Sequence, residues 1–260
     1  MLTLYTVVKG FEGEFAHIQR NAINSWMHTL PGAEVVLFGD DEKWAIEEAE
    51  ERGLPILPMV RTEGGAPFLP DIIRSAHGSA RYDVRMLINA DIILEPGIVQ
   101  AVQVVDDLFD DFLLVSWRWG ATVDYEIDFE DEDWHAKLLE LPWQRGRVDA
   151  ADFFCYRGDL MDEMPDFGMG RTAWDNWIIT QARRKRIPIV DGSELSRALH
   201  QDHAKTASKQ ALADKKNKVL AEEVARNRRL FNSLVKRVAT LQDVTHYLDK
   251  DGTLRERIAR

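Results

Sequence analysis

The sequence contains a single cysteine, Cys155, among its 260 residues. One cysteine cannot form an intramolecular disulfide, which excludes the small disulfide-stapled classes and fits a reducing compartment. A chain of this length buries roughly 70–75% of the surface that its unfolded form exposes. We therefore expect a globular core that needs neither a disulfide nor a structural metal.

Long apolar runs are also missing. No stretch of about 18 apolar residues occurs, so we expect no transmembrane segment. The first ten residues lack both the basic region and the apolar stretch of a signal peptide. Together with the lone cysteine, these absences predict a cytoplasmic location.

The sequence has no excess of positive charge. It carries 33 Lys and Arg against 44 Asp and Glu, a net charge of −11, which argues against a globally basic nucleic-acid binder. The charge is uneven: residues 205–237 carry a net +7 and residues 1–204 about −18. The basic segment is either the solvated face of a helix or a surface for an anionic acceptor, such as a lipid-linked glycan, an acidic polysaccharide or nucleic acid.

Short apolar runs alternate with helical patterns over the first two thirds of the chain. The expected strands are 2–8, 33–38, 54–57, 84–88, 112–117, 152–156 and 187–190, and the expected helices include 43–52, 69–80, 97–109 and 172–184. This rhythm predicts an α/β fold whose mostly parallel central sheet is covered on both faces. We expect one Rossmann-like domain over residues 1–204, with residues 205–260 as a helical C-terminal extension packed on it.

Polar side chains follow several of the expected strands. They are Thr6, Asp40, Asp41, Asn89 and Asp91. Ligands of parallel sheets bind at the carboxyl ends of strands, and carboxylates there suit a divalent cation. Asp40 and Asp41 could equally form a turn or cap the next helix. Asp91 lies between two apolar runs, where a carboxylate is costly unless it has a partner, and this favours a functional role.

Four segments carry a resemblance to a known family. They are Gln19–Trp26, Ile88–Leu94, Gly170–Trp177 and His200–His203. In this order they resemble a family of GT-A-fold glycosyltransferases over about residues 1–235, and Asn89-Ala90-Asp91 resembles its D-x-D motif with Asn in the first position. The resemblance implies a GT-A-like domain that moves a sugar from a UDP- or GDP-sugar to an acceptor hydroxyl with the help of Mn²⁺ or Mg²⁺.

The resemblance also implies residue roles on the donor side. Asp91 would hold the metal against the diphosphate, and His200 or His203 would complete the metal shell. Asn89 would contact ribose or a metal-bound water. Thr6, Asp40 and Asp41 join the donor-binding set, and Arg61 in a glycine-containing loop borders the donor pocket. For either histidine, the alternative is a capping or core role.

Asp175 is the candidate general base of an inverting transfer, which needs a proton acceptor near the acceptor hydroxyl. The alternative is a capping box with Thr172, in which Asp175 would have a lowered pKa. Trp174 and Trp177 are spaced to share a helix face, and we expect one in the core and one as a sugar-stacking platform. Asp152 either lines the acceptor side or is a buried structural carboxylate.

Other interpretations remain at this point. Arg118 could pair with a phosphate or neutralise the acidic segment 124–133. A sugar nucleotidylyltransferase would need a Gly- and Arg-rich loop after the first strand, whereas Lys9–Glu14 holds two acids and no arginine. A non-catalytic module that binds a nucleotide sugar or a polyanion is the remaining alternative.

Overall fold

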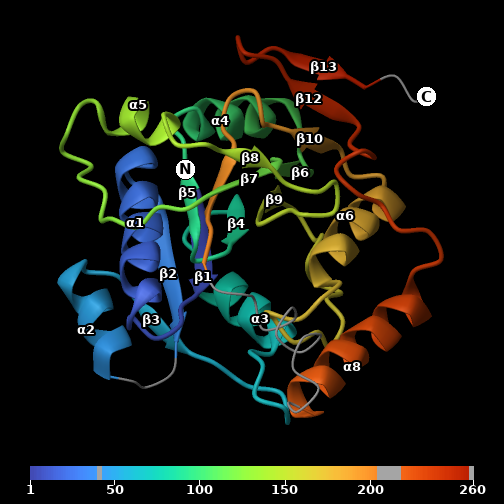
Figure 1. The fold of residues 1–260 in the computed structure, drawn as a ribbon. Coiled ribbons are helices and arrows are strands. Elements are labelled where there is room, and N and C mark those ends of the chain that lie inside the picture. Colours follow the sequence, from blue (N-terminus) through green and yellow to red (C-terminus); the bar gives the residue numbers. More distant parts are fainter. Residues whose placement is uncertain (40–42, 204–217, 258–260) are drawn as a thin grey trace.

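A computed structural model describes residues 1–39, 43–203 and 218–257, and Figure 1 shows its fold. Its helices are α1 (Glu14–Thr29), α2 (Lys43–Glu51), α3 (Leu69–Ser79), α4 (Ile98–Leu108), α5 (Trp134–Leu139), α6 (Trp174–Lys185) and α8 (Lys218–Leu234). A central sheet contains β1 (Thr3–Val7), β2 (Glu34–Gly39), β3 (Ile56–Pro58), β4 (Arg85–Ile88), β6 (Phe112–Val115), β9 (Phe153–Arg157), β10 (Ile189–Asp191), β12 (His246–Leu248) and β13 (Leu254–Glu256).

The central sheet has the strand order β13-β12-β10-β6-β9-β4-β1-β2-β3. Its strands are parallel except β9, which is antiparallel to β4 and β6, and β13, which is antiparallel to β12. The expected α/β fold with a mostly parallel sheet is therefore confirmed. The carboxyl ends of seven parallel strands share one edge, and β9 divides them into two groups.

A smaller sheet lies beside the first. It has the order β5-β11-β7-β8, formed by β5 (Ile92–Leu94), β11 (Ala198–Gln201), β7 (Arg118–Ala121) and β8 (Gln144–Arg145). β11 is antiparallel to β5 and parallel to β7. This pairing brings residues near 200 to the segment that follows β4.

Apolar side chains fill both faces of the central sheet because its strands are buried on both sides. One core cluster joins the sheet to α3 and α6, and the other joins it to α1 and α4. Trp26 of α1 is fully buried, and its indole nitrogen donates to the Ile92 carbonyl at 2.8 Å. This bond fixes α1 against β5, next to the turn that carries Asp91.

The C-terminal segment differs from the expected helical extension. α8 is helical, but β12 and β13 extend the edge of the central sheet, so the expectation is wrong for residues 246–256. Each strand spans only three residues, which is too short to show a periodic pattern in the sequence. Within the described residues, no helix is long and apolar enough to cross a membrane.

Candidate active site

Asp91 lies in the turn between β4 and β5, at the carboxyl edge of the central sheet. The register of β5 and β11 pairs Ile92 with His200, which places that imidazole beside the turn. Oδ2 of Asp91 is 3.3 Å from Nε2 of His200 and 3.0 Å from Nε2 of His203. The structure thus brings together the three residues that the sequence had suggested as metal ligands.

The two imidazoles control the charge of Asp91. Burial alone would raise the pKa of this carboxyl group, but His200 and His203 lower the pKa well below its usual range. Oδ1 of Asp91 is buried and has no hydrogen-bond partner among the described residues. A buried carboxylate oxygen without a partner is costly, and a bound cation would satisfy it.

His200 has contacts at both ring nitrogens. Nδ1 lies 3.1 Å from Oδ1 of Asp202, and Nε2 lies 2.8 Å from Nη2 of Arg118. Burial lowers the pKa of His200, but the carboxylates of Asp91 and Asp202 outweigh this effect and raise the pKa to about 9. Because a guanidinium can only donate, the Arg118 contact instead requires a lone pair on Nε2. A proton, Arg118 and a cation would therefore compete for this one lone pair.

These residues fit a divalent cation. The cluster supplies one carboxylate and two imidazoles whose ligand atoms lie within 4.8 Å of one another. Asp202 can accept the Nδ1 proton of His200, so that the lone pair of Nε2 could bind a metal in place of Arg118, an arrangement common at metal-ligating histidines. The sequence analysis assigns no role to Asp202. Its place within the His200–His203 segment is the feature of the sequence that points to it.

Asp152 lies next to this cluster. Its Oδ1 accepts a hydrogen bond from Nδ2 of Asn89 at 3.0 Å, and its Oδ2 is 3.4 Å from Nε of Arg118. Burial raises the pKa of Asp152, and the nearby charge of Asp91 raises the pKa further. Arg118 thus contacts His200 and Asp152, so the suggestion that it neutralises segment 124–133 is wrong.

Asp175 is in the first turn of α6. Burial is the main cause that raises the pKa of Asp175 to about 7, and the charges of Asp152 and Asp149 also raise it. A hydrogen bond of 2.9 Å from the backbone amide of Asn176 acts in the opposite direction and lowers the pKa. The capping box is not formed: the N-cap residue is Ala173, with φ of 85° and no side-chain cap bond. Thr172 Oγ1 is buried without a hydrogen-bond partner among the described residues. The left-handed backbone conformation of Ala173 is incompatible with the geometry of a capping box.

Trp174 and Trp177 are both core residues. They are only 6% and 3% exposed, and their rings pack on Phe154 and Phe167 at centroid distances of 5.7 and 6.4 Å. The expectation that one of them offers an open stacking face is therefore not met. At the start of a helix packed on the central sheet, this spacing turns both indoles inward.

The remaining candidates are dispersed. Thr6 is fully buried and donates from Oγ1 to the Ile88 carbonyl at 2.6 Å, so its hydroxyl joins β1 to β4. Arg61 donates from Nη1 to the Gly65 carbonyl at 2.7 Å within its own loop. Asp40 and Asp41 lie outside the described residues.

Comparisons with known proteins give weak likenesses. No protein-family model and no curated protein matches this chain. Among solved structures, S. aureus TarS in complex with UDP-GlcNAc is 13% identical with a TM-score of 0.49, over 89% of this chain and 70% of that one. A candidate nucleotide-diphospho-sugar transferase from Desulfovibrio desulfuricans is 12% identical with a TM-score of 0.45, over 89% of this chain and 97% of that one. These values are too low to assign a family.

Proposed function

We propose that this protein is a metal-dependent glycosyltransferase that moves a sugar from a nucleotide-diphosphate sugar to an acceptor hydroxyl. The observation that supports it is the cluster of Asp91, His200 and His203, with one buried carboxylate oxygen left without a partner. Asp152 and Asp175 extend the row of acidic groups away from this cluster: the charge of Asp91 raises the pKa of Asp152, and the charge of Asp152 raises the pKa of Asp175. We assign the transfer chemistry to residues 1–204, with the described residues 218–257 packed on them.

The donor would bind at the Asp91 cluster. A divalent cation held by Asp91, His200 and His203 would neutralise part of the charge of the diphosphate leaving group. This neutralisation matters because residues 1–204 carry a net charge of about −18. Arg118 contacts His200 of this cluster at 2.8 Å and would contact a phosphate once it is released from His200.

Asp175 would act as the general base of an inverting transfer. Its carboxylate removes the proton of the acceptor hydroxyl while the oxygen attacks the anomeric carbon and the bond from that carbon to the diphosphate breaks. A pKa of about 7 is well matched to this task near neutral pH. Asp152, which is closer to Asp91, is the alternative base and would otherwise orient the acceptor.

The acceptor is not identified by these residues. Segment 205–237, with a net charge of +7, would favour an anionic acceptor such as a lipid-linked glycan. The described part of this segment is α8, which buries Glu223, Val224, Asn227 and Phe231 against the domain. The arginines at 226, 228 and 229 lie on the same helix.

Calorimetric titration with a panel of UDP- and GDP-sugars tests the donor site. We expect one donor to bind with Mn²⁺ present and to bind at least about tenfold more weakly with the metal removed by chelation. Asp91→Asn should remove the effect of the metal, because it keeps the shape but loses the charged ligand. An unchanged affinity in that variant would contradict the proposal.

Catalysis requires a separate measurement. The parent protein should release the nucleoside diphosphate slowly by metal-dependent hydrolysis of the bound donor, which a non-catalytic binding module would not do. Asp107→Asn is a matched control on the exposed surface of α4, where the carboxylate accepts a hydrogen bond from Gln103 at 2.8 Å. It should leave both binding and hydrolysis unchanged.

A further inference from the structure

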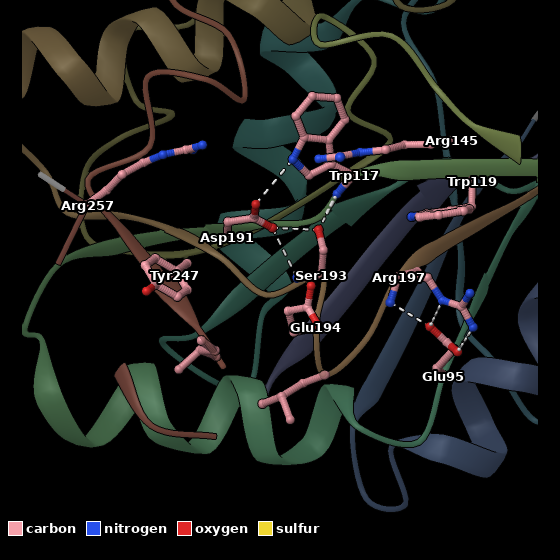
Figure 2. Close-up of a pocket in the computed structure, with 12 residues that line it drawn as sticks. Glu95, Trp117, Trp119, Arg145, Asp191, Ser193, Glu194, Arg197, Tyr247 and Arg257 are labelled. Carbon is pink, nitrogen blue, oxygen red and sulfur yellow. Dashed lines mark hydrogen bonds and ion pairs between the residues drawn. The ribbon is translucent and has the colours of Figure 1, made fainter. Parts of the chain in front are cut away.

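A cleft separate from the Asp91 cluster opens where β6, β10 and β12 end (Figure 2). Its volume is about 590 Å³, within the range of roughly 300–1,000 Å³ that is typical of small-molecule sites. Its lining includes Trp117, Trp119, Arg145, Asp191, Ser193 and Tyr247. Parallel strands on this side of β9 thus form a second place at the sheet edge where a ligand could bind.

The chain at residues 117–119 separates the cleft from the candidate active site. The side chains of Trp117 and Trp119 line the cleft, whereas Arg118 between them reaches His200 and Asp152. Successive side chains of an extended chain point to opposite faces, which explains the division. A ligand in the cleft would therefore contact a different set of groups from the donor.

The inner wall of the cleft is fixed without a ligand. Oδ1 of Asp191 accepts hydrogen bonds from the hydroxyl and the amide of Ser193, at 2.5 and 3.0 Å. Oδ2 of Asp191 accepts from the indole nitrogen of Trp117 at 3.2 Å, and the Trp117 amide donates to the Ser193 hydroxyl at 2.7 Å. Figure 2 shows this set of bonds in the middle of the cleft. Such preorganisation lowers the cost of ordering the wall when a ligand binds.

Aromatic rings and guanidinium groups surround this wall. The guanidinium of Arg145 lies 3.6 Å from the ring centroid of Trp117, and that of Arg197 lies 5.4 Å from the centroid of Trp119. Tyr247 is opposite Asp191 in the strand register and is 40% exposed. The cleft thus offers the exposed ring of Tyr247 and guanidinium groups next to indole rings, beside fixed hydrogen-bond donors and acceptors.

The charges of the lining side chains balance. Arg145, Arg197 and Arg257 stand against Glu95, Asp191 and Glu194, and two of them form a pair, with Nη2 of Arg197 at 2.8 Å from Oε1 of Glu95. A phosphate-rich ligand would meet the carboxylates of Asp191 and Glu194. A sugar hydroxyl can both donate and accept, so it can use both signs of charge, while the C–H face of the sugar ring packs on aromatic rings.

We propose that this cleft binds a neutral saccharide, as a site distinct from the one that would hold the donor sugar. Binding of the saccharide does not depend on the proposed transfer reaction, because the lining groups are separate from the Asp91 cluster. Only the role of this site, to hold a glycan unit beside the transfer site, rests on the proposed function.

Calorimetry and tryptophan fluorescence of the full chain test the proposal with four probes. Maltotriose and chitotriose are the neutral saccharides, trigalacturonate is the charged saccharide, and UDP is the nucleotide. We expect at least one neutral trisaccharide to bind. Tyr247→Ala and Arg145→Ala should each weaken this binding by about tenfold, the usual effect of losing an important contact residue.

Matched variants make the result specific. Tyr125→Ala removes another exposed tyrosine, and Arg147→Ala removes an exposed arginine two residues from Arg145, neither of which lines the cleft. Both should bind the saccharide normally, as should Asp91→Asn. Failure of both neutral trisaccharides to bind at millimolar concentration would overturn the proposal, as would binding that Tyr247→Ala and Arg145→Ala leave unchanged. It would also be overturned if only UDP or trigalacturonate bound through Arg145.

Discussion

Asp175 shows how strongly the fold changes the chemistry of a single side chain. As a cap it would have a lowered pKa, yet burial at the start of α6 raises its pKa to about 7. The sequence pattern of Thr172 and Asp175 could not reveal this, because it depends on the left-handed conformation of Ala173. A carboxyl group with a strongly perturbed pKa near other ionisable groups is a candidate for proton transfer.

The first prediction concerns the pH dependence of transfer. A base must be deprotonated, so the rate should fall as pH decreases through about 7, the pKa of Asp175. Asp175→Asn should bind donor nearly normally and lose about 10²–10⁴-fold in transfer rate, measured by release of nucleoside diphosphate with acceptor present. Transfer within a few-fold of the parent rate would instead direct attention to Asp152.

The second prediction concerns stability. Between pH 4 and 7 the unfolded state ionises at Asp175 while the folded state stays protonated, so the free energy of unfolding decreases as pH rises through this range. Asp175→Asn removes this cost and should stabilise the protein by roughly 1–3 kcal/mol at pH 8, with little effect at pH 4. Urea titrations at both pH values measure the difference. Equal effects at the two pH values would mean that the group is not perturbed.

The metal cluster could be predicted only in part from the sequence. The suggested ligands Asp91, His200 and His203 do lie together, but their distances depend on the register of β5 and β11. The contact of Arg118 with His200 depends on the separate pairing of β11 with β7. Such long-range strand pairings are not encoded in any local pattern, because strand register is set by tertiary packing.

At the scale of elements, α8 holds two loops, one that contains Thr62 and one that contains Gly168 and Thr172. Glu223 binds Arg171 at 2.5 Å and also contacts the hydroxyl of Thr62. Asn227 is 1% exposed, exchanges hydrogen bonds with the backbone of Gly168 and donates to the Thr172 carbonyl at 3.1 Å. α8 thus fixes the segment that leads into α6.

The third prediction follows from this contact. Glu223→Gln leaves the charge of Arg171 buried without its partner and should lower the free energy of unfolding by roughly 2–4 kcal/mol. Glu222→Gln is the control, because Glu222 is on the same helix with its side chain 70% exposed, and should leave stability almost unchanged. Denaturant unfolding of both variants checks this. A similar result for the two would mean that α8 contributes by apolar packing alone.

The expected elements were predictable in proportion to their length and apolar content. The pattern over 97–109 matches α4 and that over 33–38 matches β2, since both are strongly periodic or uniformly apolar. The direction of β9 was not predictable: its sequence reads as a buried strand whichever way it runs. β12 and β13 were missed because three residues carry too little pattern.

At the scale of the whole molecule, the edge of the central sheet carries two separate candidate sites. The Asp91 cluster follows β4, and the cleft follows β6, β10 and β12, with β9 running the other way between β4 and β6. The two candidate sites have different charge: the first is a partly buried group of acidic and imidazole side chains, and the charges of the second balance. Ligands of unlike chemistry could therefore bind side by side without competing for the same groups.

The position of Cys155 in the middle of β9 has a consequence for following the folding of this protein. Its side chain is fully buried, the strand pairs with β4 and β6 on its two sides, and burial raises the pKa of the thiol. Only a thiolate reacts readily with alkylating reagents, so labelling must wait until this strand leaves the sheet. The single cysteine thus reports global opening: modification by iodoacetamide, followed by mass spectrometry, should proceed at the rate at which the protein unfolds under conditions where alkylation is faster than refolding. Modification much faster than unfolding measured by tryptophan fluorescence would show that the centre of the sheet opens locally.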